Sequence, residues 1–424
     1  MPPPIAARTQ LLALLGANYV SWFGNGVTIV AVPLYVLGRT GSTMAASVAG
    51  AASALPLVIS GVAGGALVDQ WGARRTSILA DALAALCTAA VPLLDRFEAV
   101  PFAAIVALLF LRSLFNSPAS VARLAMLPSV AAASPISRQS ANTLYQLAPR
   151  IALMLGPVVA GGAVAILGAA ATLLLDAATF AASAALVAAF VRLEAAPPRQ
   201  AAPFLQEIRS GFAFVRTRRG LLTLMFVIAA MNFIDEAFIP VLLPVYSRNV
   251  LADPRLVGWL VGANGLGAVV GTLLYLVLGP RLATLHWPTF VTCLGVLAVM
   301  RLAMTALPGL VLASAVLFVF GLASGPLNPI INTVVQDTVP PALRGRVFGM
   351  LSAIAFAVAP VGILVGGWVT VAWGLRAALL IFGALYGVLL VVVSRSLDLR
   401  AELRAAEAVT SPADRASARP RRAR

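Results

Sequence analysis

The chain has 424 residues, of which 61% are hydrophobic and only 11% are charged, and its net charge is +15. A soluble domain of this length covers its surface with more charge, whereas the hydrocarbon core of a bilayer favours an apolar surface. The basic residues are all Arg, and they stand in short gaps between apolar runs rather than on an aromatic-interleaved basic face. The composition therefore indicates a helical membrane protein and argues against a nucleic-acid partner.

Apolar runs follow one another along nearly the whole chain. A helix needs about 20 apolar residues to cross the hydrocarbon core. Runs of that size occupy residues 11–37, 44–68, 77–94, 100–122, 143–167, 170–191, 221–246, 256–278, 287–307, 310–335, 347–372 and 376–396. Because the first run is too long for a cleaved signal peptide, the sequence predicts twelve membrane spans.

The distribution of Arg predicts the orientation of the chain. An even number of spans places both termini on one side of the membrane. The Arg residues in the gaps on the opposite side are Arg39, Arg96, Arg248, Arg255 and Arg376. Arg123 is counted on the side of the termini, because the fourth run ends at residue 122. Since Arg concentrates in cytoplasmic segments, we expect a multi-pass protein of the bacterial inner (plasma) membrane with both termini in the cytoplasm.

The longest internal gap divides the chain into two parts. Within it, Phe204, Ile208 and Phe212 recur at helical spacing between charged residues, which predicts an amphipathic helix on the inner membrane surface. The sequence therefore predicts four regions. They are an amino-terminal six-helix bundle at 1–192, a cytoplasmic linker at 193–220, a carboxy-terminal six-helix bundle at 221–396, and a disordered basic cytoplasmic tail at 397–424.

The two predicted bundles share a glycine pattern. In the fifth span, Gly156-Pro157 and Gly161-Gly162 form a helix-packing motif, because glycines let helices approach closely. The eleventh span carries Ala359-Pro360 and Gly366-Gly367 at corresponding positions. Such internal repetition is typical of secondary transporters, whose substrate site lies between the repeats near the middle of the bilayer.

The loop between the second and third spans carries the most specific motif. It reads Gly65-Ala-Leu-Val-Asp69-Gln-Trp-Gly72-Ala-Arg74-Arg75. Glycines allow a tight turn, and Asp and Arg can cap helix ends and neutralise one another at the membrane surface. The alternative interpretation is an ordinary positively charged inner loop.

This loop resembles the Gly-x-x-x-Asp-x-x-Gly-Arg-Arg loop of the major facilitator superfamily. The stretches that resemble its drug-exporter branch, with macrolide-efflux and siderophore-exporter-like proteins, are Gly24-Asn25-Gly26, Leu111-Arg112, Leu155-Gly156-Pro157 and Arg344-Gly345-Arg346. The resemblance covers nearly the whole chain. It implies an all-α fold of twelve transmembrane helices in two pseudo-symmetric six-helix bundles that rock about a central site. It also implies that Asp69 and Arg74 latch one state at the cytoplasmic face. Asn25 departs from the branch, which often has an acidic residue there.

Polar side chains inside the spans are the candidates for substrate and proton contacts, because such groups are costly at bilayer depth. Helical spacing groups them into stripes on the first, seventh and tenth spans. The resemblance implies that these spans and the fourth line the cavity. The candidate residues are Asn18, Trp22, Asn25, Arg112, Asn232, Asp235, Glu236, Asn328, Asn332 and Gln336.

Arg112 lies halfway along the fourth span, where an unpaired guanidinium is costly. Asp235 and Glu236 lie at similar depth, so we hypothesise that one of them balances Arg112 and that one exchanges a proton during the cycle. The alternative is a static pair that secures helix packing. The other ionisable residues of the spans are Asp81, Arg150 and Asp337, which we interpret as structural, and Asp176 and Arg301, whose roles stay open.

Several function classes find no support in the sequence. Without Lys, the chain has no Gly-x-x-x-x-Gly-Lys-[Ser/Thr] loop for ATP. Cys87, Cys293 and His286 stand apart, without metal-ligand spacing. We therefore expect no enzyme, no cofactor and no metal site.

The leading interpretation is a monomeric secondary transporter in the lipid bilayer. It would be a proton-coupled exporter (antiporter) of amphiphilic small molecules or drugs, with protons and a small-molecule substrate as partners. The alternatives are a transporter of the same fold for a specific solute, such as a siderophore or metabolite, and a non-transporting membrane sensor.

Overall fold

A computed structural model describes residues 4–95, 101–134, 136, 138–192, 212–282 and 285–410. Helices make up almost all of these ranges, and no β-strand occurs within them. A helix satisfies every backbone N–H and C=O within its own segment, which hydrocarbon surroundings demand. The predicted all-α class is confirmed.

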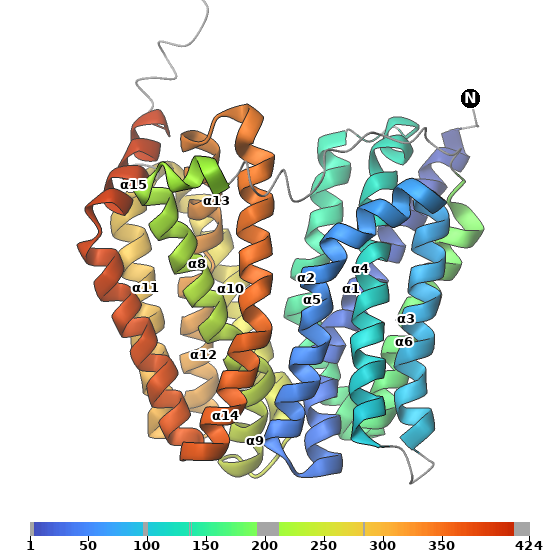
Figure 1. The fold of residues 1–424 in the computed structure, drawn as a ribbon, viewed down its shortest axis with the longest axis horizontal. Coiled ribbons are helices and arrows are strands. Elements are labelled where there is room, and N and C mark those ends of the chain that lie inside the picture. The colour runs from blue at the N-terminus through green and yellow to red at the C-terminus, as the bar shows by residue number, and fades with distance from the viewer. Residues whose placement is uncertain are drawn as a thin grey trace, which may run out of the picture. The chain divides into compact units, whose positions relative to one another are not determined.

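The chain divides into two compact units. Unit 1 comprises Met1–Ala201, Glu236–Gly262 and Ala359–Ala372, and unit 2 comprises the rest. The first six helices, all in unit 1, are α1 (Pro4–Thr40), α2 (Thr43–Trp71), α3 (Ala73–Asp95), α4 (Phe102–Ala132), α5 (Arg138–Leu167) and α6 (Ala169–Phe190). They lie side by side, coloured from blue to green in Figure 1. Within this group α1 packs against α5 and α6, and α4 packs against α2 and α3.

The second half of the chain supplies the remaining helices. They are α8 (Arg219–Ala237), the π-helix η1 (Phe238–Leu242), α9 (Leu243–Asn249), α10 (Leu256–Leu282), α11 (His286–Ala303), the 3₁₀ turn η2 (Met304–Ala306), α12 (Leu310–Ser324), α13 (Leu327–Thr338), α14 (Pro341–Arg395) and α15 (Leu397–Thr410). The segments α8, η1 and α9 follow one another without a break. Pro240 lies in η1, where the wider turn accommodates a residue that lacks an N–H.

The helices account for the twelve predicted spans. Ten helical segments of the described ranges have the length and hydropathy of a membrane span. Helix α2, with 29 residues, is also long enough to cross. Helix α14 has 55 residues and breaks at Gly374, where φ is 81°, so it supplies two spans. Gly168 has nearly the same φ, 82°, between α5 and α6, which matches the repeated glycine pattern. The prediction of twelve spans is confirmed.

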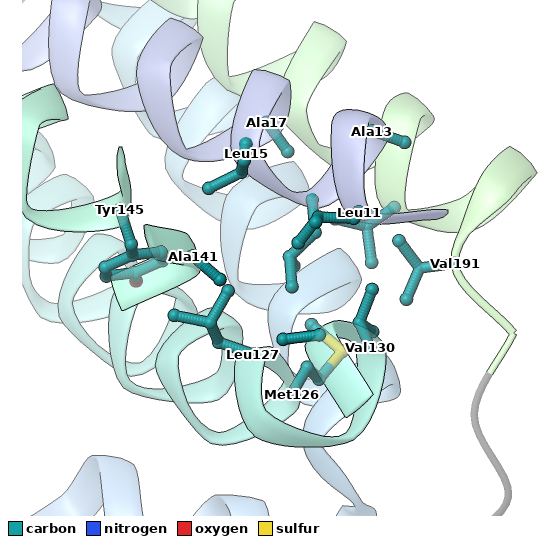
Figure 2. Close-up of a cluster of buried hydrophobic side chains, with 13 residues drawn as sticks. Leu11, Ala13, Leu15, Ala17, Met126, Leu127, Val130, Ala141, Tyr145 and Val191 are labelled. Atoms are coloured by element: carbon teal, nitrogen blue, oxygen red, sulfur yellow. The ribbon is translucent and has the colours of Figure 1, made fainter. Parts of the chain in front are cut away.

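The apolar core at one end of unit 1 joins α1, α4 and α5. Figure 2 shows the side chains of this core converging from these helices and from the end of α6. Its members include Leu11, Leu14, Leu15, Met126, Leu127, Val130, Tyr145 and Val191. Because lipid tails are as apolar as these side chains, van der Waals contact between the helices, rather than removal of apolar surface from water, favours such packing.

Glycines bring backbones into contact within unit 1. A Cβ on Gly156 of α5 would lie 2.7 Å from the Cα of Gly26 on α1, so these helices touch without intervening side chains. A Cβ on Gly161 would lie 3.0 Å from the Cα of Gly258 on α10, and the Pro157 carbonyl borders the same contact. The remaining glycine of the motif, Gly162, has no neighbour within 4 Å.

Two sequence-based boundaries are wrong. Helix α4 continues to Ala132, so Arg123 lies inside this helix rather than in a gap after it. The tail predicted to be disordered forms α15 over Leu397–Thr410, because its Leu399 and Leu403 are fully buried and α15 packs against α13 and α11. Residues 411–424 lie outside the described residues. So does most of the predicted amphipathic linker helix, of which only residues 212–216 are described, as helix.

Candidate functional site

Arg112 of α4 lies in the interior of unit 1, where it contacts four side chains. Its Nη2 lies 2.9 Å from Oδ2 of Asp176 on α6. The same nitrogen lies 2.9 Å from Oδ1 of Asn25 and 3.1 Å from Oγ1 of Thr28, both on α1. The Phe180 ring lies 5.0 Å from the guanidinium. The side chains of Arg112 and Asp176 are 5% and 0% exposed, so this ion pair is sealed inside the helices.

Neutral groups also bind the Arg112 guanidinium, in addition to Asp176. A buried cation is costly unless its N–H groups are satisfied. Asn25, Thr28 and the Phe180 ring provide acceptors and a π face that do not titrate. Asn116 Nδ2 donates to the same oxygen of Asn25 at 3.1 Å. The arrangement can therefore keep Arg112 in place whether or not Asp176 carries a charge.

The partner expected for Arg112 was wrong. We expected Asp235 or Glu236, whereas the structure pairs Arg112 with Asp176. The sequence did contain the relevant signal, because Asp176 is an acidic residue inside an apolar run. Depth along separate helices does not reveal which helix faces are adjacent, so depth alone could not choose among the carboxylates.

Asp235 of α8 pairs with Arg301 of α11, within unit 2. The Arg301 guanidinium lies 4.1 Å from the ring centre of Phe320 on α12 and 5.8 Å from that of Tyr386 on α14. The side chain of Arg301 is 3% exposed, whereas that of Asp235 is 37% exposed. Aromatic rings therefore enclose the cation, while the carboxylate stays partly open.

An amide stripe runs along one face of α13. Asn328, Asn332 and Gln336 recur every fourth residue, and all three are exposed. The opposite face, with Ile330 and Val334, is buried. In a membrane protein an exposed polar stripe faces water or a polar ligand rather than lipid, so this face suits a solute pathway. On α8, half-buried Asn232 donates to the Ile228 carbonyl at 2.8 Å.

The polar face predicted on the first span points largely into unit 1. Asn18 is fully buried, and its Nδ2 donates to the Tyr145 carbonyl at 3.1 Å. Asn25 accepts hydrogen bonds from Arg112, and Trp22 is half-buried. The structure therefore places Asn18 in helix packing rather than on an open surface.

A second buried ion pair was missed by the sequence analysis. Arg123 of α4 pairs with Asp81 of α3, and both side chains are fully buried. Arg123 also donates to Ser21 Oγ at 3.0 Å and to Ser183 Oγ at 3.2 Å. Arg123 follows Arg112 by about three helical turns, so the shared helix face was the available signal. Ending the fourth span at residue 122 concealed it.

The loop motif forms the turn between α2 and α3. Gly72 has φ 80°, in the left-handed region that favours glycine. Arg74 donates to the carbonyls of Val191 and Ala188, at 2.6 Å each, and a cation is favourable at this carboxy-terminal end of α6. Arg75 is exposed. The structure does not describe the side chain of Asp69, so the latch stays a prediction.

Twelve spans with charged groups inside them are the architecture of a polytopic membrane transporter. The sequence profile of the Major Facilitator Superfamily matches residues 14–235 and 225–422. The chain belongs to this family, as its motifs predicted. It is therefore a transporter rather than an enzyme.

Two of the relatives are efflux proteins. The chain is 34% identical over 381 residues to the multidrug efflux pump Tap of Mycolicibacterium fortuitum, covering 88% of this chain and 92% of the pump. It is 22% identical over 365 residues to macrolide efflux protein A of Streptococcus pyogenes, covering 82% and 87% of the two chains. The crystal structure of the nucleoside transporter NupG superposes with a TM-score of 0.73 at 15% identity, covering 91% of this chain and 98% of NupG. The last similarity shows the fold alone.

Proposed function

We propose that this chain is a proton-coupled exporter, an antiporter of amphiphilic small molecules or drugs that works by alternating access. The observation that carries the proposal is the 34% identity to a multidrug efflux pump over 88% of this chain. The buried ion pairs support proton coupling, because ionisable groups inside membrane spans commonly serve as proton sites.

The solute would contact the amide stripe of Asn328, Asn332 and Gln336. These side chains are exposed on a membrane-spanning helix, and neutral amides can both donate and accept hydrogen bonds. Such contacts tolerate solutes with differently placed polar groups, which suits a broad exporter. Unit 2 also contains the tilted ring pair Phe233 and Phe382, with centroids 6.1 Å apart, near the carboxylate-bearing turn of α8.

Asp235 is the carboxylate that we assign to proton exchange in unit 2. Its side chain is 37% exposed, so a proton can reach it, and its counterion Arg301 is held by aromatic rings as well. Protonation would release the carboxylate from Arg301 without leaving the guanidinium unsupported. Asp235→Asn should therefore reduce substrate-induced proton movement in reconstituted vesicles, and Glu236→Gln tests the neighbouring carboxylate. Retained coupling in both variants would exclude the two carboxylates as proton sites.

The function itself is tested by accumulation of solutes in bacterial cells that lack their own exporters. Cells that express this chain should accumulate less ethidium or erythromycin than cells with an empty vector, and a proton uncoupler should abolish the difference. If expressing cells and empty-vector cells accumulate both probes to the same level, the result would argue against a broad exporter. Export limited to one physiological solute, such as a siderophore, would support the specific-transporter alternative.

The remaining expectations concern the latch and the surroundings of the chain. We propose that the protein is a monomer in the bacterial inner membrane, and its Arg distribution supports the placement of both termini in the cytoplasm. Asp69 and Arg74 would then lie at the cytoplasmic face. Asp69→Ala should shift the balance between inward-open and outward-open states, which probe cysteines on either side can measure. Unchanged cysteine accessibility would count against the latch.

A further inference from the structure

The interior of unit 1 contains more polar groups than helix packing requires. Arg112 and Arg123 lie about three turns apart on α4, and they pair with acids on two different helices, Asp176 on α6 and Asp81 on α3. On α6, Asp176 and Ser183 are separated by about 10 Å along the axis. The two clusters therefore share one side of α6, one above the other.

Helices α1 and α4 continue the polar groups between the two ion pairs. On α1, Asn25 binds Arg112, and Ser21, one turn earlier, binds Arg123. On α4, Asn116 and Ser120 fill the two turns between the arginines, at the spacing of one helix face. Asn116 donates to Asn25, and Arg123 lies 3.4 Å from the Ser120 hydroxyl. We call this line of polar side chains from Asp176 to Asp81 the polar column.

Buried atoms along the polar column have no hydrogen-bond partner among the described residues. They are Oδ1 of Asp176, Oδ1 of Asn116, Nε of Arg123, Oδ1 of Asp81 and Oγ of Ser77. Their side chains are all at least nine-tenths buried. Buried polar groups are normally satisfied by protein or by water, and a polar interior site with several such groups is where internal water binds.

Each carboxylate is surrounded by groups that allow it to change its charge. Arg112 and the Thr28 hydroxyl face Asp176, with Thr28 Oγ1 2.6 Å from Oδ2. Arg123 and Ser183 face Asp81, with Ser183 Oγ 2.7 Å from Oδ2. In both cases the arginine also binds neutral acceptors, which remain when the carboxylate is protonated. The free Oδ1 is the atom to which a proton would bind.

Tyr145 of α5 is the remaining titratable side chain near the Arg123–Asp81 pair. Its hydroxyl donates to the Ser120 carbonyl at 3.0 Å, and it lies close enough to Asp81 and Arg123 to interact electrostatically with both. No other charged side chain is recorded against either carboxylate in the described part of unit 1.

We infer that unit 1 contains a second coupled proton site at Asp176, reached from Asp81 through a file of internal waters along the polar column. The inference rests on the proton-coupled transport proposed above. In each hop an O–H bond of the donor breaks as an O–H bond of the acceptor forms, so the file moves a proton without other chemical change. Ser77, one turn from Asp81 toward the amino-terminal start of α3, leads the column toward the membrane surface. The polar column belongs to unit 1, whereas the amide stripe of α13 belongs to unit 2.

The test measures protons moved per probe molecule in liposomes that contain the full chain and a trapped pH indicator. The probe is ethidium, or erythromycin where the accumulation assay shows that it is the one moved. If each unit exchanges one proton, Asp176→Asn, Asp81→Asn and Asn116→Leu should each lower the ratio to about half the wild-type value. Thr370→Val is the matched control, because it removes a buried hydroxyl that binds only its own helix, and it should keep the ratio.

The outcomes separate the two proposals. If Asp235→Asn lowers the ratio while the three column variants keep it, the polar column is not a proton path and the proposed coupling stands. If the wild type moves the probe without protons, both proposals fail. If a variant moves no probe, its ratio cannot be measured. The polar column is then tested by a high-resolution structure of the unaltered protein. Ordered water beside Asn116, between Asp81 and Asp176, is the expected result, and a dry interior would overturn the inference.

Discussion

Units 1 and 2 each bury an arginine beside an aspartate, but different groups surround the two ion pairs. In unit 1, Arg112 binds amide and hydroxyl oxygens, and Asp176 is fully buried. In unit 2, Arg301 lies between aromatic rings, and the side chain of Asp235 is 37% exposed. Both cations have support besides the carboxylate. The difference lies in how a proton can reach each acid.

The stability of a charged pair inside a membrane protein therefore depends more on the groups around it than on its depth in the bilayer. A sealed pair leaves an uncompensated charge when one partner is removed, which is strongly destabilising. In a partly open pair, water can hydrate the remaining carboxylate, or a proton can neutralise it. Removal of the cation should therefore cost more stability in the sealed pair of unit 1 than in the partly open pair of unit 2.

The largest effect is expected for Arg112→Met. This change leaves Asp176 buried without its cation and should lower the free energy of unfolding by about 3–5 kcal/mol, measured by thermal or denaturant unfolding of the purified protein in detergent. Combining Arg112→Met with Asp176→Leu should recover most of the loss, because neither charge then remains. A double variant as unstable as the single one would mean that packing, not charge, explains the loss.

Gly24→Ala should have the next largest effect. A Cβ on Gly24 of α1 would collide with Oδ1 of Asp176 and with the Thr179 side chain, so it presses directly on the sealed carboxylate. Overpacking of this kind costs about 2–3 kcal/mol. Gly38→Ala, on the same helix with nothing within 4 Å, is the matched control and should change the free energy of unfolding by less than about 0.5 kcal/mol.

Arg301→Met should cost less than Arg112→Met, about 1–2 kcal/mol, because the exposed carboxylate of Asp235 keeps access to water or a proton. The same unfolding assay measures both variants side by side. If Arg301→Met proves as destabilising as Arg112→Met, the contrast between a sealed and an open pair does not hold.

The smallest effect concerns the rings around Arg301. Phe320→Leu removes the ring that lies 4.1 Å from the guanidinium. Phe290→Leu removes an equally buried ring of unit 2 for which no contact with a cation is recorded among the described residues. The difference between the two variants should be about 1 kcal/mol, the contribution of the cation–π contact. It should vanish in an Arg301→Met background, and a difference that persists there would assign the effect to shape alone.

The sequence anticipated parts of the candidate site and missed others for identifiable reasons. The stripe of Asn328, Asn332 and Gln336 was predictable, because helical periodicity alone determines which residues of one helix share a face. Arg112 and Asp235 are recognisable as costly intramembrane charges, yet depth along the helices predicts Asp235 or Glu236 as the partner of Arg112, which is wrong. Their partners Asp176 and Arg301 lie on other helices, and only packing brings those faces together.

By itself, the sequence determined the number of membrane spans and the all-α class, because the length of an apolar run and the need to satisfy backbone hydrogen bonds within hydrocarbon are properties of single segments. Tertiary structure alone decided which acid meets which arginine, which carboxylate is sealed, and how Arg123 became part of the polar column. Those outcomes depend on helix rotation and close contacts such as Gly26 against Gly156. Such contacts join residues that are far apart in the chain, and no local pattern encodes them.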